Sequence, residues 1–274
     1  MATRSAVQVA VRPDPALRAC VTSYAGFELR GFPPGVHLGT PGRSLTVVVS
    51  LAEPLDVVDA DGAVPRSGRF GAVAGGLTSR SVAIRHDGAL HGVRLSLTPL
   101  GARALLGVPA AALAHDLVPL DDVLGRLGTE LVDRVRDART WPDRFAALDA
   151  VLARAARRRT PVADPVRREV DEAWRRLVVH RGRVRIGALA ADLGWSRRNL
   201  GERFREEIGL TPKEAARVLR FEHAHDLATA ADAPSWADVS ARAGYADQAH
   251  LVREWREFTG RPPTTWRRGE VLPP

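Results

Sequence analysis

The feature that most constrains the fold is an internal repeat near the C-terminal end of the chain. Each copy has a short amphipathic segment, a glycine followed by an aromatic residue, and a second amphipathic segment. The turn glycines, Gly194 and Gly244, lie 50 residues apart. Glycine permits positive φ at such a turn, so two helices can cross sharply there. The repeat therefore predicts two helix-turn-helix units, Ile186–Gly209 and Trp236–Gly260.

Three helix starts in this repeat carry capping signals. Ser196 and Asp247 each stand just before a second helix, where a side-chain oxygen can accept a hydrogen bond from a free backbone N–H group. Thr211–Glu214 reads Thr-Pro-Lys-Glu, a capping box with proline at the first helical position. This segment predicts the start of a long helix that joins the two copies.

The spacing of apolar residues separates a buried face from an open face in each second helix. The residues predicted to face inward are Leu200, Phe204 and Ile208 in copy one, and Leu251, Trp255 and Phe258 in copy two. An open face at the start of a second helix is the part that enters a DNA major groove. A single charged face is as readily explained by solvation, but two matched copies joined by a capped helix predict DNA binding.

The second copy also carries the pattern of a known family. Ala243–Leu251 reads Ala-Gly-Tyr-Ala-Asp-Gln-Ala-His-Leu, and Trp255–Arg267 reads Trp-Arg-Glu-Phe-Thr-Gly-Arg-Pro-Pro-Thr-Thr-Trp-Arg. Residues 170–268 resemble the tandem helix-turn-helix DNA-binding domain of AraC family transcription regulators, over a little more than a third of the chain. That family usually has phenylalanine near Trp255 and tyrosine near Trp266, so both positions hold conservative aromatic exchanges.

The resemblance implies that the second helix of each copy is a recognition helix for double-stranded operator DNA. Arginine can read O6 and N7 of guanine, glutamine N6 and N7 of adenine, and alanine only the thymine methyl group. Glu202 can accept from cytosine N4 or pair with Arg198 four residues earlier, and we favour the pair. The expected DNA-binding residues are Ser196, Arg197, Arg198, Asn199 and Glu202 in copy one, and Asp247, Gln248, Ala249, His250 and Arg253 in copy two.

The first 98 residues predict β-structure. Leu45–Leu51 is a β-branched apolar run between turn residues, and Leu55–Ala60 is a second candidate strand. Val82–His86 and Val93–Leu97 alternate apolar and polar residues on either side of Asp87-Gly88, which predicts a hairpin. Frequent glycine and proline breaks indicate a small barrel or sandwich.

Helical signals follow the strands. Thr98-Pro99 predicts a capped helix start. Apolar residues from Leu120 to Val135 mark one amphipathic helix, and those from Phe145 to Leu152 mark a second. This helical hairpin is either core alone or also a dimer interface. Arg157–Pro161 is polar and ends in proline, so the domains are predicted to be 1–160 and 165–274.

A second, less sharp resemblance covers the N-terminal region. Leu97–Pro109 and Leu120–Gly125 resemble part of a sensor-like domain found with AraC-type regulators in actinobacteria. The resemblance implies that this domain binds a small-molecule effector or forms a homodimer, and the pattern does not disclose the ligand. The predicted fold class is α+β with two domains: a β-rich barrel or sandwich with a helical hairpin, then an all-α tandem helix-turn-helix domain.

Composition narrows the class of protein. The chain has 40 basic and 32 acidic residues, but residues 161–274 hold 20 and 17, so bulk charge does not locate a DNA site. Cys20 is the single cysteine, which excludes an intramolecular disulfide, a cysteine-rich zinc module and cysteine-using DNA-repair fusions of the AraC module. No apolar run approaches the roughly 20 residues of a membrane helix, and no signal pattern opens the chain, so a cytoplasmic protein is expected.

The sequence shows no clear motif for catalysis, cofactor binding or metal binding. There is no nucleophile elbow, P-loop or dinucleotide fingerprint, so neither an enzyme nor a cofactor is expected. His37, His86 and His91 lie in the strand-rich half without an acidic partner at metal-ligand spacing, so no metal is expected. The rival interpretations are an enzyme with a catalytic N-terminal barrel and a non-specific architectural DNA binder.

Overall fold

The computed structural model describes residues 4–58, 67–158 and 165–269. The chain divides into two compact units: an N-terminal unit of Met1–His37, Ser44–Gly76 and Val82–Ala163, and a C-terminal unit of Leu38–Arg43, Leu77–Ser81 and Asp164–Pro274. The boundary predicted within Arg157–Pro161 and the end of the strand predicted to reach Ala60 lie partly outside the described residues.

The N-terminal unit is built on two antiparallel sheets. The six-stranded sheet runs β1 (Ser5–Val11), β2 (Val21–Arg30), β9 (Leu90–Leu97), β4 (Leu45–Ser50), β7 (Ala72–Gly75) and β10 (Leu117–Pro119). The four-stranded sheet runs β3 (Gly35–Gly39), β8 (Val82–His86), β5 (Leu55–Val58) and β6 (Gly68–Phe70). A small apolar core holds buried residues of both sheets, including Val57 of β5 and Val73 of β7. The prediction of a β-rich first domain is therefore confirmed.

The hairpin predicted at Asp87-Gly88 is wrong. Strands β8 and β9 do flank this turn, but they belong to different sheets. Both edges of β9 are occupied, by β2 on one side and by β4 on the other, while β8 pairs with β5. Gly88 is needed for another reason: a Cβ atom there would lie 1.9 Å from the carbonyl oxygen of Phe32. The turn is thus a corner between sheets.

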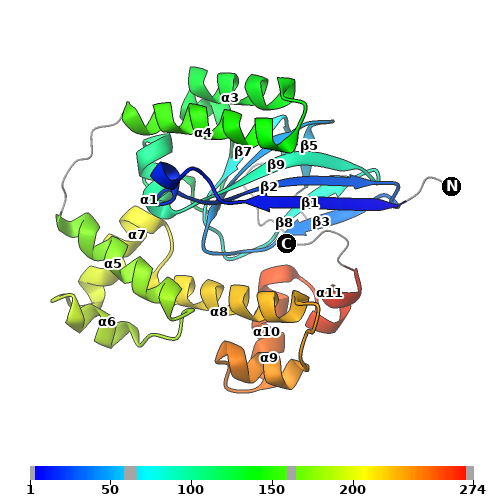
Figure 1. Ribbon diagram of the computed structural model, residues 1–274. Coiled ribbons are helices and arrows are strands. Elements are labelled where there is room, and N and C mark those ends of the chain that lie inside the picture. Colours follow the sequence, from blue (N-terminus) through cyan, green and yellow to red (C-terminus); the bar gives the residue numbers. More distant parts are fainter. Residues whose placement is uncertain (1–3, 59–66, 159–164, 270–274) are drawn as a thin grey trace. The chain divides into compact units, whose positions relative to one another are not determined.

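Helices α3 (Arg126–Asp137) and α4 (Trp141–Arg157) cover one face of the six-stranded sheet (Figure 1). Two shorter helices precede them in the chain: α1 (Pro99–Gly101), which continues as a π-helical turn, and α2 (Leu120–Leu124). Thr98 caps α1 as predicted, by accepting a hydrogen bond from Gly101 N at 2.9 Å. The single helix predicted from Leu120 to Val135 is interrupted, because Gly125 takes φ 57° and ψ −137° between α2 and α3.

Helix α4 lies directly on strand β2. A Cβ atom on Gly26 would come within 2.4 Å of the Trp141 ring, so only glycine admits the helix this closely. Tyr24 stacks on Phe145 and donates a hydrogen bond of 2.8 Å to Asp149. The apolar stripes of α3 and α4 are buried within the unit, which confirms their prediction as core.

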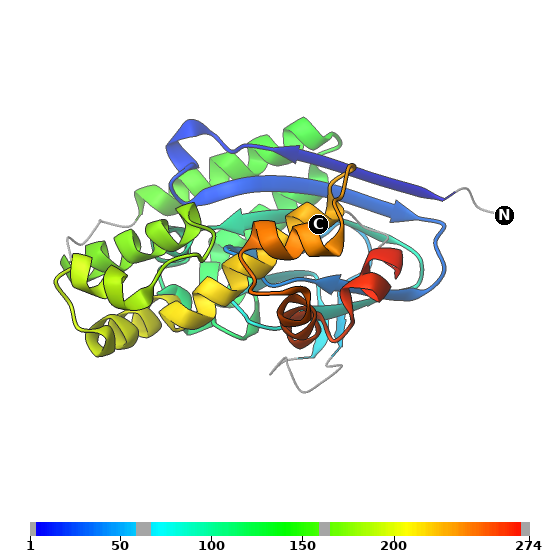
Figure 2. The same cartoon turned by 90° about the horizontal axis from the view of Figure 1, so that it is seen from below.

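The C-terminal unit is built of helices, apart from the two short segments Leu38–Arg43 and Leu77–Ser81. Its helices are α5 (Pro165–Val179), α6 (Ile186–Asp192), α7 (Arg197–Ile208), α8 (Pro212–Thr229), α9 (Trp236–Ala243), α10 (Gln248–Thr259) and α11 (Pro263–Gly269). Helices α5 to α7 gather at one end of α8, and α9 to α11 at the other (Figures 1 and 2). Within the described part of the chain, no helix has both the length and the apolar character needed to cross a membrane.

Candidate nucleic-acid interface

The first helix pair, α6 and α7, turns at Gly194. This glycine has φ 73°, and the next residue, Trp195, donates from its backbone N to Ala190 O at 2.9 Å. Ser196 then caps α7 through a hydrogen bond of 3.1 Å from Asn199 N. The sharp turn and the cap both follow the sequence prediction.

The second pair, α9 and α10, repeats this geometry. Gly244 has φ 82°, and Tyr245 donates from its backbone N to Ser240 O at 3.0 Å. Asp247 caps α10 by accepting from His250 N at 2.6 Å. The two copies are therefore built from the same local interactions.

The apolar face of each second helix is buried as predicted. The six residues Leu200, Phe204, Ile208, Leu251, Trp255 and Phe258 are all at most 1% exposed. Helix α8 supplies much of the surface they pack on, and its capping box forms between Thr211 and Glu214. Phe221 of α8 meets Trp255 edge-on, at 5.1 Å between ring centroids. Each open face is consequently held outward by a fully packed opposite face.

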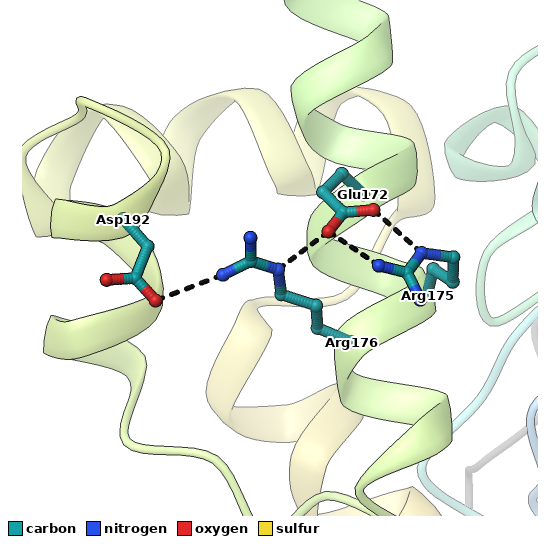
Figure 3. Close-up of polar contacts among 4 residues, drawn as sticks. All are labelled: Glu172, Arg175, Arg176 and Asp192. Carbon is teal, nitrogen blue, oxygen red and sulfur yellow. Dashed lines mark hydrogen bonds and ion pairs between the residues drawn. The ribbon is translucent and has the colours of Figure 1, made fainter.

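An ion-pair chain anchors the first copy to α5 (Figure 3). Glu172 accepts hydrogen bonds of 2.7 Å from Arg175 and from Arg176, and Arg176 reaches Asp192 of α6 at 3.0 Å. The hydrogen bonds from Arg175 and then Arg176 lower the pKa of Glu172 to about 2. Because Arg175 and Asp192 are exposed and the other two groups are half-buried, these ion pairs contribute little stability, and we assign to them the orientation of α6.

A buried carboxylate anchors the second copy to α8. The side chain of Glu254 in α10 is only 7% exposed and lies 2.7 Å from Arg217 and 3.6 Å from Arg220. Arg217 also binds Glu257 and lies over the ring of Phe258. Burial by itself lowers the pKa of Arg217, but the hydrogen bonds to Glu257 and Glu254 outweigh it and raise the pKa. Sequence reasoning missed this cluster, because charge spacing along one helix does not show a partner on another.

The structure places the ten predicted DNA-binding residues in two groups. The exposed residues lie on the first two turns of α7 and α10 and at their caps: Arg197, Arg198, Glu202, Gln248, Ala249, Arg253, Ser196 and Asp247. Asn199 and His250 are half-buried. Ser196 and Asp247 are also committed to capping, so their side chains serve the helices.

Three of these residues, Arg198, Glu202 and His250, contact other side chains of the protein. Arg198 binds Glu202 at 2.8 Å, which is the pairing that the sequence favoured. The His250 ring meets Tyr245 edge-on, and its Nε2 lies 3.7 Å from Glu254. His250 is thus turned toward the protein interior. Arg253, in contrast, has no carboxylate at ion-pair distance among the described residues, so its guanidinium is available to a ligand.

The histidines of the N-terminal unit and Cys20 were the other candidate site residues. Among the described residues, no three His, Cys, Asp or Glu side chains are grouped so that they could hold a metal ion. Burial, followed by the charges of Arg94 and His86, lowers the pKa of His37 to about 4. His91 meets Trp141 edge-on, at 5.6 Å between ring centroids. Burial raises the pKa of the Cys20 thiol, which disfavours the reactive thiolate.

Comparison with known proteins agrees with this geometry. Residues 189–269 match a family model described as a helix-turn-helix domain. No curated protein matches the chain. The fold is similar to that of ToxT from Vibrio cholerae O395, with TM-score 0.51, 10% identity, and 89% of this chain and 97% of that chain covered.

Two ligand-bound structures of the same protein are similarly related to this chain. Unsaturated fatty acid bound wild-type ToxT from Vibrio cholerae strain SCE256 has TM-score 0.52, 10% identity, and full coverage of both chains at 100%. ToxT from strain O395 bound to (E)-4-(8-methylnaphthalen-1-yl)but-3-enoic acid has TM-score 0.52, 11% identity, and coverage of 89% and 98%. At this identity the likeness establishes the fold.

The matched domain and the two-unit fold together define a class of protein. The C-terminal unit contains a helix-turn-helix domain of the AraC type, as its sequence resemblance implied. A domain of this type is a DNA-binding module, and it points to a regulator of transcription rather than to an enzyme.

Proposed function

We propose that the chain is a sequence-specific regulator that inserts α7 and α10 into successive major grooves, about 34 Å apart along one face of the DNA. The observation that carries this proposal is the matched pair of capped helices, each with its apolar face fully buried and its first turn exposed. An enzyme would not need two such faces, and a non-specific binder would not need uncharged groups on them.

The exposed side chains suggest how the bases are read. Arg197 and Arg253 suit guanine, Gln248 suits adenine, and Ala249 suits a thymine methyl group. The Arg198–Glu202 pair lies beside Arg197, and its net charge is zero. We therefore assign the larger part of the base reading in copy one to Arg197.

Replacing Arg253 with alanine tests this assignment. Binding to the preferred duplex should weaken by about 1–3 kcal/mol, because a bidentate contact with one guanine is lost, and binding to random DNA should change little. Electrophoretic mobility shift or fluorescence anisotropy measures both affinities. Arg256→Ala, on the same helix but in its last turn, is the matched control. An equal loss of affinity for both duplexes would show that Arg253 contacts a phosphate and not a base.

We further propose that the N-terminal unit binds a small carboxylic acid as effector. Arg94 lies on β9, four residues after Leu90 and opposite Val48 of β4. Leu90 and Val48 both pack against the apolar core between the sheets. Since alternate residues of a strand share a face, Arg94 points toward the same inter-sheet space. No carboxylate pairs with it among the described residues, and burial lowers its pKa. An anionic ligand would neutralise this charge.

Oleic acid and its uncharged analogue oleyl alcohol distinguish an acid site from simple apolar binding. The ligand class is suggested by the acids bound to ToxT. At saturating concentration below the micellar range, oleic acid should raise the Tm of the wild-type protein by about 5 °C or more, and the alcohol should not. Arg94→Met should abolish this rise, while Arg85→Met, at an exposed arginine of the same unit, should retain it. An equal response to acid and alcohol would contradict the proposal.

A homodimer remains a prediction. The apolar stripes of α3 and α4 are used within the N-terminal unit, so a dimer would need another surface or the polar outer faces of these helices.

A further inference from the structure

The loop between α5 and α6 carries three arginines that neither the sequence prediction nor the helix-turn-helix pattern explains. Residues 181–185 read Arg-Gly-Arg-Val-Arg, and Arg181, Arg183 and Arg185 are all exposed. We call this segment, Arg181–Arg185, the arginine loop. Its position relative to the two recognition helices decides what it can bind.

The backbone of the arginine loop is firmly seated on α8. Arg181 takes φ 52° and Gly182 takes φ 72°, both in the left-handed region. Gly182 N donates to Leu177 O at 2.8 Å, and a Cβ atom on Gly182 would lie 2.0 Å from Ala216 O. Only glycine allows this approach. The loop is therefore a built element with a defined place.

The arginine loop lies between the N-terminal ends of α7 and α10. On one side it leads directly into α6, where Arg197 of α7 lies 3.5 Å from the Cβ position of Gly187. On the other side, Arg183 Cδ and Nε lie 3.0 Å from the Cβ position of Gly244, the turn glycine before α10. The N-terminal end of a recognition helix is the end that meets the DNA. The loop thus bridges the two ends that face the duplex.

Several arginines lie close together in this region. Arg181 contacts His223 of α8 at 2.8 Å, and burial followed by the charges of Arg181, Arg242 and Arg183 lowers the pKa of His223. Among the described residues, no carboxylate forms an ion pair with Arg183, Arg185 or Arg242. Elsewhere in the unit, arginines commonly have such partners, namely Arg175, Arg176, Arg198, Arg203, Arg217 and Arg220. Within the described part of the chain, the guanidinium groups of this region are therefore free of carboxylates and lie close together, at the junction of the two copies.

We propose that the arginine loop, together with Arg242, binds the phosphodiester backbone of the DNA segment that lies between the two major-groove sites. This inference rests on the proposed function, because it takes α7 and α10 to occupy successive grooves. The backbone between those grooves then passes the bridge that joins their N-terminal ends. Guanidinium groups bind phosphate oxygens in forked geometry, and such contacts add affinity and fix register without reading sequence.

The salt dependence of binding tests the proposal on the full-length protein. The probes are a duplex enriched by the wild-type protein from a random pool and a scrambled duplex of equal composition. The double variant Arg183→Gln, Arg185→Gln should reduce the slope of log K against log salt by about 2 on both duplexes, so affinity falls about tenfold less between 50 and 200 mM salt. Arg69→Gln with Arg134→Gln, two exposed but ion-paired arginines of the N-terminal unit, should leave the slope unchanged.

Arg185→Gln alone separates phosphate binding from a packing effect, because the contact with the Gly244 turn is made by Arg183. This variant should reduce the slope by about 1 while its Tm stays at the wild-type value. Neutral methylphosphonates at the central linkages of the enriched duplex should weaken binding by the wild-type protein more than binding by the double variant, which keeps only Arg181 and Arg242 of the site. An unaltered slope in both variants would overturn the inference. Failure of the proposed function would show differently, as a wild-type protein that binds enriched and scrambled duplexes equally.

Discussion

Replacing Glu254 with alanine is expected to lower the free energy of unfolding of the C-terminal unit by about 3 kcal/mol and to abolish binding to the preferred duplex. The carboxylate is buried and lies between two arginines of α8. Its loss leaves Arg220 without an ion-pair partner among the described residues and leaves Arg217 with the exposed Glu257 alone. An uncompensated charge in a buried site costs several kcal/mol, so α10 should detach from α8.

Glu257→Ala is the matched control for this prediction. Glu257 pairs with the same Arg217, but its side chain is 58% exposed, so its removal should cost less than about 1 kcal/mol. Urea unfolding followed by tryptophan fluorescence measures both variants, because five of the six tryptophans lie in the C-terminal unit. Similar costs for Glu254 and Glu257 would show that the buried carboxylate does not anchor the recognition helix.

Lowering the pH from 6.5 to 4 is expected to destabilise the C-terminal unit by about 3 kcal/mol through His225 alone. This histidine is 4% exposed, stacks on Trp255 and meets Trp266 edge-on. Burial lowers its pKa from 6.5 to about 4. Above pH 6.5 the ring is neutral in both states, and the stability is fully present. Between pH 6.5 and 4 only the unfolded state takes up the proton, so stability falls with pH.

Replacing His225 with phenylalanine keeps an aromatic ring and removes the titrating group. Between pH 6.5 and 4, this variant should lose less unfolding free energy than the wild type does. The two losses should differ by about 3 kcal/mol. His37 has a similarly low pKa but titrates in both proteins, so it cancels from the comparison. His180→Gln, at an exposed histidine, is the control. Parallel pH profiles for the wild type and the phenylalanine variant would contradict the buried, neutral state.

The correct predictions concern features encoded within a few residues of one another. Ser196, Asp247 and Thr211 cap the helices that they precede, since a cap is a contact between residues three apart. The buried faces of α7 and α10 follow from helical periodicity, which needs no knowledge of the partner surface. The AraC-type domain could be recognised because its turns and caps are local and repeated.

The errors have two kinds of cause: the pairing of distant segments, and local features that the apolar pattern does not show. Val82–His86 and Leu90–Leu97 form strands as their alternation predicts, yet they pair in different sheets because β9 is already flanked by β2 and β4. Helix α11 was not predicted, because its seven residues span too few turns for a helical periodicity to be recognised. The interruption at Gly125 follows from a backbone conformation that the apolar pattern does not encode.

The sequence by itself determined that this protein has two capped helix-turn-helix units, which follow a β-rich domain along the chain, and which faces of their second helices are open. Only the tertiary structure decided what holds those helices and which charges remain for a ligand. Glu254 and Glu202 look alike in the sequence, but one is buried against α8 and the other pairs on the surface. Arg183 and Arg175 likewise differ only in their neighbours. Caps and periodicity act along the chain, whereas burial and charge pairing depend on segments far apart in it.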